Sequence, residues 1–274
     1  MPAHSEIFAG NRALGRIAFS VEAGDKGTRR RRVHEAGALQ VRFPNVASKS
    51  ALDAVIVNTA GGMTGGDRFD IDVAVGAGAR LTVTTAAAEK VYRSLGPATQ
   101  IDVKLDVGAG AALAWLPQET ILFDRVRLRR SIEVALAPDA SLLLAEGVVF
   151  GRSAMGETVM HGHFFDRWRV RVDGALVFAE SLRLDGAIAQ RLAARAVAGA
   201  GVAIASVLKL PGDDEAVAAV RALEKDFAGE VGVSAWNGLA VARLVAPDGA
   251  GLRHDLIRVL TALGDVPLPR LWLN

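Results

Sequence analysis

The sequence predicts a mainly β protein: stacked, repeated strand–turn–strand units (β-hairpins, as a sandwich or irregular β-solenoid), with a C-terminal α+β portion containing two helices. Two observations favour this class. One motif occurs three times at intervals of 30 and 31 residues, and helical spacing of apolar residues occurs only beyond residue 186. No linker rich in proline or serine divides the chain. We therefore expect a single domain over 1–274, with a β body at 1–185 and the α+β portion, 186–274, packed on it.

The repeated units begin alike and soon reach a tight turn. They start at Ile71-Asp72-Val73, Ile101-Asp102-Val103 and Ile132-Glu133-Val134. Their turns begin at Val75, Val107 and Leu136, and a second apolar strand follows each turn. Glycine readily adopts the positive φ that hairpin turns need. The turns are 32 and 29 residues apart, so the register of the repeat is not strict.

Each unit also ends alike, with a glutamate, an apolar pair, an aromatic residue and an arginine. The glutamates are Glu89, Glu119 and Glu146, and the arginines are Arg93, Arg125 and Arg152. Units of this kind cannot bury their own apolar faces and should stack, which brings the three glutamates together. Neighbouring carboxylates are costly unless they are paired or bind a metal ion. Ion pairs within each unit and a carboxylate-lined path for cations are both open interpretations.

A catalytic use of the three glutamates is a further hypothesis. A β-solenoid hydrolase of the glycosidase type would use two of them as acid and base, beside an aromatic groove that binds sugar. One tyrosine and four tryptophans provide little material for such a groove. The chain also lacks the common nucleophile–base motifs of hydrolases. We therefore expect that the protein is not an enzyme.

The last third of the chain contains the helical patterns. Asp213 is a typical N-cap, and apolar residues follow at 216, 220, 223 and 227 before Gly229. Asp248 begins a second helix, which keeps the same spacing through Leu252 and Leu256 and ends at Gly264. Residues 231–245 are expected to form a hairpin or two strands, and 202–210 a strand.

Composition excludes several classes of protein. The chain has no cysteine, so it has neither disulfides nor a thiolate zinc site. Aromatic residues make up only 5%, which argues against a surface for nucleic-acid bases. The longest uncharged apolar stretch, 196–208, is too short to cross a membrane. We expect a soluble, cytoplasmic protein.

The run Arg29–Arg32 is typical of a solvated turn or edge strand. The alternative is that these arginines bind an acidic surface of a partner.

Two short motifs could belong to a binding site. The glycine loop 58–67 lacks the lysine of a phosphate-binding loop and precedes a strand. Asp67, directly after the loop, would suit either a ligand site or an Asx turn. In His161-Gly162-His163 both rings would lie on one face of a strand, which is either a two-nitrogen metal site or an ordinary surface strand.

Four longer motifs, in one order along the chain, resemble the urease accessory protein family UreD, also called UreH. They are Asn58–Asp67 (NTAGGMTGGD), Ala88–Ser94 (AEKVYRS), Leu116–Phe123 (LPQETILF) and Pro269–Trp272 (PRLW). Shorter matches are Gly151-Arg152, Met155-Gly156-Glu157 and Leu184-Asp185-Gly186. The resemblance runs from about residue 10 to the end of the chain.

The resemblance implies a scaffold rather than a catalyst. Members of the family bind apo-urease and recruit UreF, and through it the GTPase UreG, with a dimer of the accessory complex as one arrangement. Nickel in transit is the implied cargo, with no tightly bound cofactor. It is thought to cross the UreD subunit toward the carbamylated lysine of urease. Asp67 and Glu180 match acidic positions linked to that channel. Carboxylates suit weak, reversible binding of Ni²⁺ better than thiolates.

The surfaces for these partners are predicted only in outline. Leu252, Leu256 and Trp272 lie in the C-terminal region where we expect the contact with UreF. The run Arg29–Arg32 is a candidate for the urease-binding face.

Overall fold

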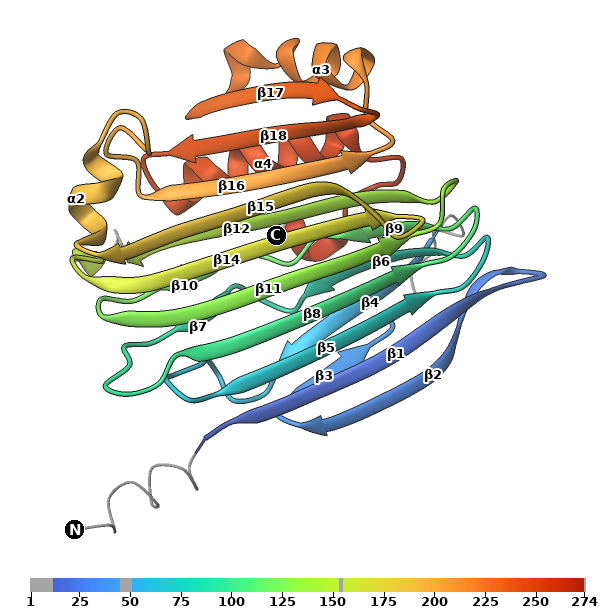
Figure 1. The fold of residues 1–274 in the computed structure, drawn as a ribbon, viewed down its shortest axis with the longest axis horizontal. Helices are drawn as coiled ribbons and strands as arrows, with labels where there is room; N and C mark the ends of the chain where they lie inside the picture. The colour runs from blue at the N-terminus through green and yellow to red at the C-terminus, as the bar shows by residue number, and fades with distance from the viewer. Residues whose placement is uncertain (1–11, 45–50, 153–154, 274) are drawn as a thin grey trace.

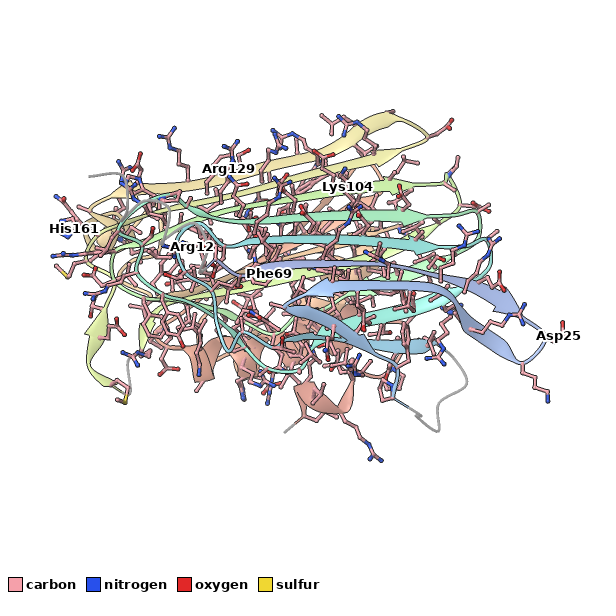
Figure 2. All side chains as sticks on the ribbon, turned by 90° about the horizontal axis from the view of Figure 1, so that it is seen from below. Arg12, Asp25, Phe69, Lys104, Arg129 and His161 are labelled. Atoms are coloured by element: carbon pink, nitrogen blue, oxygen red, sulfur yellow. The ribbon has the colours of Figure 1, made fainter. Side chains whose placement is uncertain are left out.

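Two facing β-sheets and a C-terminal cap of helices make up the fold (Figure 1). The computed structural model describes residues 12–44, 51–152 and 155–273. In Figure 1 the chain climbs from the first strands at one end of the stack to the helices at the other. The strands run along the long axis of the molecule, and Figure 2 shows Asp25 and His161 at its opposite ends.

The first sheet, sheet A, has seven strands. In spatial order they are β15 (Ala175–Gly186), β14 (Gly162–Val172), β11 (Val126–Leu136), β8 (Thr99–Val107), β5 (Arg68–Val75), β1 (Leu14–Gly24) and β2 (Gly27–Gly37). The five strands from β14 to β1 pair in parallel, and the two edge strands pair antiparallel to their neighbours. The β14–β15 connection at Asp173-Gly174 is a tight hairpin turn, in which both residues have positive φ.

The second sheet, sheet B, has eleven strands. The main path is β17 (Glu230–Trp236), β18 (Leu239–Ala246), β16 (Ala203–Leu210), β12 (Ser141–Arg152), β9 (Ala112–Trp115), β6 (Arg80–Thr85), β4 (Leu52–Asn58) and β3 (Leu39–Arg42). The short strands β7 (Glu89–Val91), β10 (Thr120–Leu122) and β13 (Glu157–Thr158) attach beside it. The strands from β4 to β12 are parallel, as in a solenoid.

The predicted class of stacked strand–turn–strand units is confirmed, but the turns within the units are not hairpins. In each unit the strand before the turn lies in sheet A and the strand after it lies in sheet B. Each turn is therefore an arch that carries the chain from one layer to the other. Gly78 and Gly110 have φ of 68° and 61° in two of these arches, a conformation that favours glycine.

The spacing of the turns predicts the register of the stack better than the spacing of the opening motifs. Ile71 aligns with Val103, and Val103 aligns with Ile132. These offsets are 32 and 29 residues, equal to the spacing of the turns. Aligning Ile71 with Ile101 is wrong by two residues. A shift of two keeps every side chain on the same face, so the apolar pattern alone cannot detect it.

The C-terminal portion extends sheet B and covers its outer face. Both predicted helices are present, as α3 (Asp214–Arg221) and α4 (Gly249–Leu263), and the side chains of Asp213 and Asp248 cap them. α3 ends at Arg221, earlier than the predicted stop at Gly229. The short helix α2 (Ile188–Ala193) and two 3₁₀ turns, Glu224–Asp226 and Arg270–Trp272, are further elements. One apolar core lies between the sheets, and a second lies between sheet B and the helices α3 and α4.

The run Arg29–Arg32 lies on β2, at the edge of sheet A. β2 pairs with β1 on one side and is exposed along almost its whole length. Arg29 and Arg31 contact Glu22, at 2.8 and 3.5 Å. The structure thus places the run on an edge strand, where cations discourage pairing with other chains.

Of the helices in the described ranges, none has the length and hydrophobicity that crossing a bilayer requires.

Candidate functional site

An arginine and two carboxylates are buried together between the sheets. Arg130 is on β11 and Asp166 is its direct neighbour on β14, while Glu146 faces them from β12. Their exposed fractions are 3%, 7% and 5%. We call these three residues the Arg130 triad. Inward positions of β11 alternate with outward ones, so Arg130 occupies a position in line with the apolar core residues Leu128 and Ile132.

The guanidinium of Arg130 joins the two carboxylates. Its Nε and Nη2 donate to Asp166, at 3.1 and 2.6 Å. Its Nη1 donates to Oε2 of Glu146 and, more weakly at 3.4 Å, to the hydroxyl of Thr120. The indole Nε1 of Trp115 donates to the other oxygen of Glu146 at 2.9 Å. Every charged group of the triad therefore has a partner, which a buried charge requires.

Burial and charge act in opposite directions on the pKa of Glu146. Desolvation raises it, the charge of Arg130 lowers it, and the net result is a pKa of about 7 instead of 4.5. Desolvation lowers the pKa of Arg130, but Asp166 and Glu146 together raise it by more, so the guanidinium stays charged. Burial thus moves the pKa of Glu146 toward neutral pH.

Two cavities meet at the triad. The Glu180 cavity has a volume of about 160 Å³ and contains Glu180, Ser206 and Arg243 in its lining. The Glu89 cavity, of about 60 Å³, lies between the sheets, and its lining includes Glu89 and Asn58. Two residues line both cavities, Arg130 and Glu146. We use the term route for the line of side chains along these two linings, from Glu180 through the triad to Glu89.

The two ends of this route have different surroundings. Glu180 accepts hydrogen bonds from Ser206 Oγ at 3.2 Å and from Arg243 at 2.7 Å. Glu89 accepts one from Asn58 Nδ2 at 2.9 Å, and burial raises its pKa. No cation pairs with Glu89 among the described residues. Glu89 is therefore the acidic group of the route that lacks a positive partner.

Replacing Glu146 by glutamine should test the raised pKa. The Glu146 carboxyl favours the folded state most when it is protonated. As pH rises from about 4.5 to 7, the unfolded chain releases this proton and the folded chain keeps it. We expect the unfolding free energy of the wild type, relative to E146Q, to fall by up to about 3 kcal/mol over this range. Denaturant titrations at several pH values would measure it. A difference that is independent of pH would show that Glu146 remains ionised.

The three glutamates of the repeat do not form one column. Glu89 pairs with Thr120, and Thr120 pairs with Val148, so Glu119 and Glu146 are out of register with Glu89. Glu119 is one position away from Thr120, and its side chain points to the opposite face, toward α4. The prediction of three adjacent glutamates is therefore wrong, and so is the glycosidase hypothesis that used them together.

The predicted ion pairs within each unit are also wrong. Glu146 pairs with Arg130 and Glu119 with Arg253, while Arg125 contacts Asp124 and Arg152 contacts Glu157. Pairing itself occurs, but Glu146 pairs with an arginine on the other strand of its own unit and Glu119 with an arginine of α4, outside the repeat. The motif spacing shows which residues are equivalent, and the alternation of strand faces decides which of them meet.

Asp67 is buried at the start of β5 and holds two chain segments together. Its Oδ1 accepts the backbone N–H of Ala13 at 2.9 Å, and its Oδ2 accepts that of Thr64 at 2.7 Å. The bond to Thr64 closes the end of the glycine loop, as in the Asx-type alternative. Asp67 lines neither of the two cavities at the triad. Both of its oxygens are used in holding the loop to the start of β1.

Leu252, Leu256 and Trp272 are buried, with exposed fractions of 0%, 1% and 1%. Trp272 donates its indole N–H to the carbonyl of Leu116 at 3.0 Å. The two leucines belong to the core between sheet B and the helices. This burial leaves the three side chains little surface for a contact with UreF, which stays a prediction for this region. The apolar stripe of α4 faces sheet B because sheet B offers an apolar outer face to cover.

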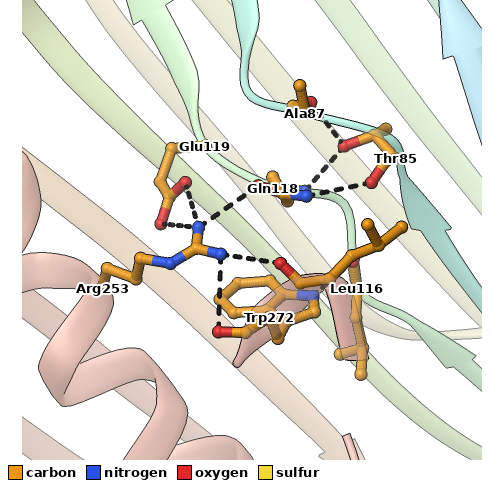
Figure 3. Close-up of polar contacts among 8 residues, drawn as sticks. Thr85, Ala87, Leu116, Gln118, Glu119, Arg253 and Trp272 are labelled. Atoms are coloured by element: carbon orange, nitrogen blue, oxygen red, sulfur yellow. Dashed lines mark hydrogen bonds and ion pairs between the residues drawn. The ribbon is translucent and has the colours of Figure 1, made fainter. Parts of the chain in front are cut away.

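Arg253 connects α4 to the segment before β10 and to the C-terminus (Figure 3). Its Nη1 donates to Glu119 at 3.0 Å and to Gln118 at 3.3 Å, and its Nη2 donates to the carbonyl of Leu271 at 2.9 Å. Its guanidinium carbon lies 5.3 Å from the centre of the Trp272 ring. The motifs 116–123 and 269–272, which carry the family resemblance, are thus structural neighbours that stabilise one another.

The histidine pair is on the surface. His163 contacts Asp185 and lies 3.5 Å from Arg127, and it is about half exposed. The His161 backbone N–H donates to Asp124. Among the described residues, no group of three histidines or carboxylates has the geometry of a metal site. The surface-strand alternative is therefore the one that the structure favours.

Comparison with known proteins identifies the family. The family model described as UreD urease accessory protein matches residues 13–273. The chain belongs to the UreD family. It is 57% identical over 272 residues to "Urease accessory protein UreD" of Rhodopseudomonas palustris strain HaA2, covering 99% of this chain and 97% of that protein. It is 55% identical over 270 residues to the protein of the same name from Bradyrhizobium diazoefficiens, covering 98% and 97%.

Within this UreD-family chain, sequence reasoning missed two members of the triad. Arg130 and Asp166 belong to none of the motifs that carry the resemblance. A signal for Arg130 was available, because it interrupts the apolar alternation Val126, Leu128, Ile132, Val134. A charged residue at an inward position of a strand needs a buried partner. The sequence does not show where that partner lies.

Proposed function

We propose that this protein is a scaffold in the maturation of urease and that nickel crosses it between the two sheets. In this proposal it acts in the cytoplasm, binds apo-urease, recruits UreF and the GTPase UreG, and holds no resident cofactor. Membership of the UreD family supports the role in urease maturation. The observation that supports the path is the pair of cavities that share Arg130 and Glu146.

The chemistry of the route suits a divalent cation in transit. Glu180, Asp166, Glu146 and Glu89 provide oxygen ligands at successive points between the sheets. Ni²⁺ accepts oxygen ligands but is held more weakly by them than by several imidazoles or thiolates. The absence of a three-ligand cluster among the described residues agrees with passage rather than storage. Asp67 supports the fold around the route and is not one of its ligands in this proposal.

The proposal is tested by a urease activation assay. Apo-urease, UreF, UreG, GTP, bicarbonate and nickel would be combined with the wild type or with Glu180→Gln. We expect activation to fall at least fivefold in E180Q, because the variant removes a carboxylate at one end of the route. Glu133→Gln is the matched control, since Glu133 lies on the outer face of sheet A.

Complex assembly must be followed in the same samples by size-exclusion chromatography. If E180Q assembles normally and activates normally, nickel does not depend on this carboxylate and only the scaffold role remains. If the wild type neither assembles with UreF nor activates urease, the proposed function itself is wrong.

A further inference from the structure

The Arg130 triad lies between the two cavities, and the guanidinium of Arg130 places a fixed positive charge there. No other residue besides Arg130 and Glu146 appears in the described lining of both cavities. The contact between these two side chains therefore lies at the boundary of the two cavities. An arginine is an unexpected component of a path for cations, because its charge repels them.

The contacts of Arg130 are unequal. Two of its nitrogens donate to Asp166 in a bidentate arrangement, while a single nitrogen donates to Glu146. Glu146 is also held by Trp115, independently of the arginine. The contact with Glu146 can therefore break while Asp166 keeps the guanidinium and Trp115 keeps the carboxylate in place. A bidentate pair between arginine and a carboxylate is stronger than a pair that has a single hydrogen bond.

We propose that Arg130 is a built-in counter-ion that keeps the route closed. Its guanidinium takes the place beside Glu146 and Asp166 that a divalent cation would take, and it moves away from Glu146 when a cation enters. This inference rests on the proposed function for the identity of the cargo. Its consequence is that the wild-type route does not retain metal, because the carboxylates at its centre already have a positive partner.

The proposal explains why two buried carboxylates do not form a permanent metal site. Two carboxylates that are held close together without a cation either share a proton or bind a divalent ion. Guanidinium is always charged and has no acceptor atom, so it occupies such a place without ever becoming a metal ligand. Glutamine at position 130 would remove the charge and keep a polar side chain, and it would leave Glu146 and Asp166 available to a metal ion.

The experiment is a titration of the full chain with Ni²⁺ alone, without urease. Equilibrium dialysis would compare the wild type with Arg130→Gln. We expect R130Q to bind one additional Ni²⁺ per chain, at least tenfold more tightly than the wild type binds it at this place. Bound metal should also raise the unfolding temperature of R130Q and leave that of the wild type unchanged, because a ligand specific for the folded state stabilises it.

Two control variants locate the effect. Arg129→Gln removes the neighbouring arginine, which faces outward on the same strand and lies over Phe165, and should leave Ni²⁺ binding unchanged. The triple variant R130Q/E146Q/D166N has no charge at the triad and should bind no more Ni²⁺ than the wild type. Because an unpaired buried carboxylate destabilises the fold, R130Q/D166N provides a second test with only Glu146 unpaired. It should still bind Ni²⁺ more tightly than the wild type.

The proposal is overturned if folded R130Q and R130Q/D166N bind Ni²⁺ no better than the wild type. It is also overturned if the triple variant gains the same binding, because the metal would then lie elsewhere. These outcomes are separate from those of the activation assay. Loss of activation in E180Q without a gain of Ni²⁺ binding in R130Q would support the nickel path and contradict the counter-ion role of Arg130. Normal activation in E180Q with a gain of Ni²⁺ binding in R130Q would support the counter-ion role and contradict passage of nickel between the sheets.

Discussion

Trp272→Ala should lower the free energy of unfolding by about 3–5 kcal/mol, the usual range for removing a fully buried tryptophan. The side chain is 1% exposed in the core between sheet B and the helices. The variant would leave a large cavity, leave the carbonyl of Leu116 without its indole donor and remove the ring beneath Arg253. Denaturant unfolding followed by circular dichroism would measure the loss.

The matched control is Trp236→Ala, because Trp236 is 42% exposed. Its loss should be about 1 kcal/mol or less, as is usual for a surface substitution. Binding to UreF should fall in W272A only as far as the folded fraction falls. If W272A were as stable as the wild type but failed to bind UreF, Trp272 would be a contact residue, and its burial in the isolated chain would not describe the complex.

Asp67→Ala should be the second most damaging change, with an expected loss of about 2–4 kcal/mol. A charged, buried acceptor of two backbone N–H groups is removed, and both donors lose their partner. The start of β1 and the end of the glycine loop would separate. Asp67→Asn should restore little, since an amide presents only one oxygen and its NH₂ would face the second donor.

The control for Asp67 is Asp70→Ala on the same strand. Asp70 forms a partly exposed ion pair with Arg68 at 3.2 Å. Surface ion pairs usually contribute about 1 kcal/mol or less to the free energy of unfolding, so D70A should cost little. Urease activation by D67A should fall in proportion to the folded protein that remains. A variant that unfolds at the wild-type denaturant concentration yet fails to activate urease would contradict a structural role and indicate that Asp67 acts on the ion directly.

The sequence by itself determined the mainly β class, the two capped helices and the family. These features depend on local physics: turn residues, apolar periodicity and N-caps act within a few residues of one another, and contiguous motifs carry the resemblance. The turn spacing even contained the register of the stack, which the motif Ile71-Asp72-Val73 misplaced by two residues. Arg29–Arg32 was predicted on an edge strand or turn for the same local reason, its charge.

Only the tertiary structure decided which charged side chains meet. Glu89, Glu119 and Glu146 are equivalent in the repeat, yet a shift of one position sends Glu119 to the opposite face of the sheet. Arg130 finds Asp166 across parallel strands that are 36 residues apart in sequence, and Glu146 across the gap between sheets. Trp272 is buried because sheet B has an apolar outer face, a fact that no local pattern near residue 272 contains. Partners of buried charges are set by strand register and layer packing, and both depend on contacts distant in sequence.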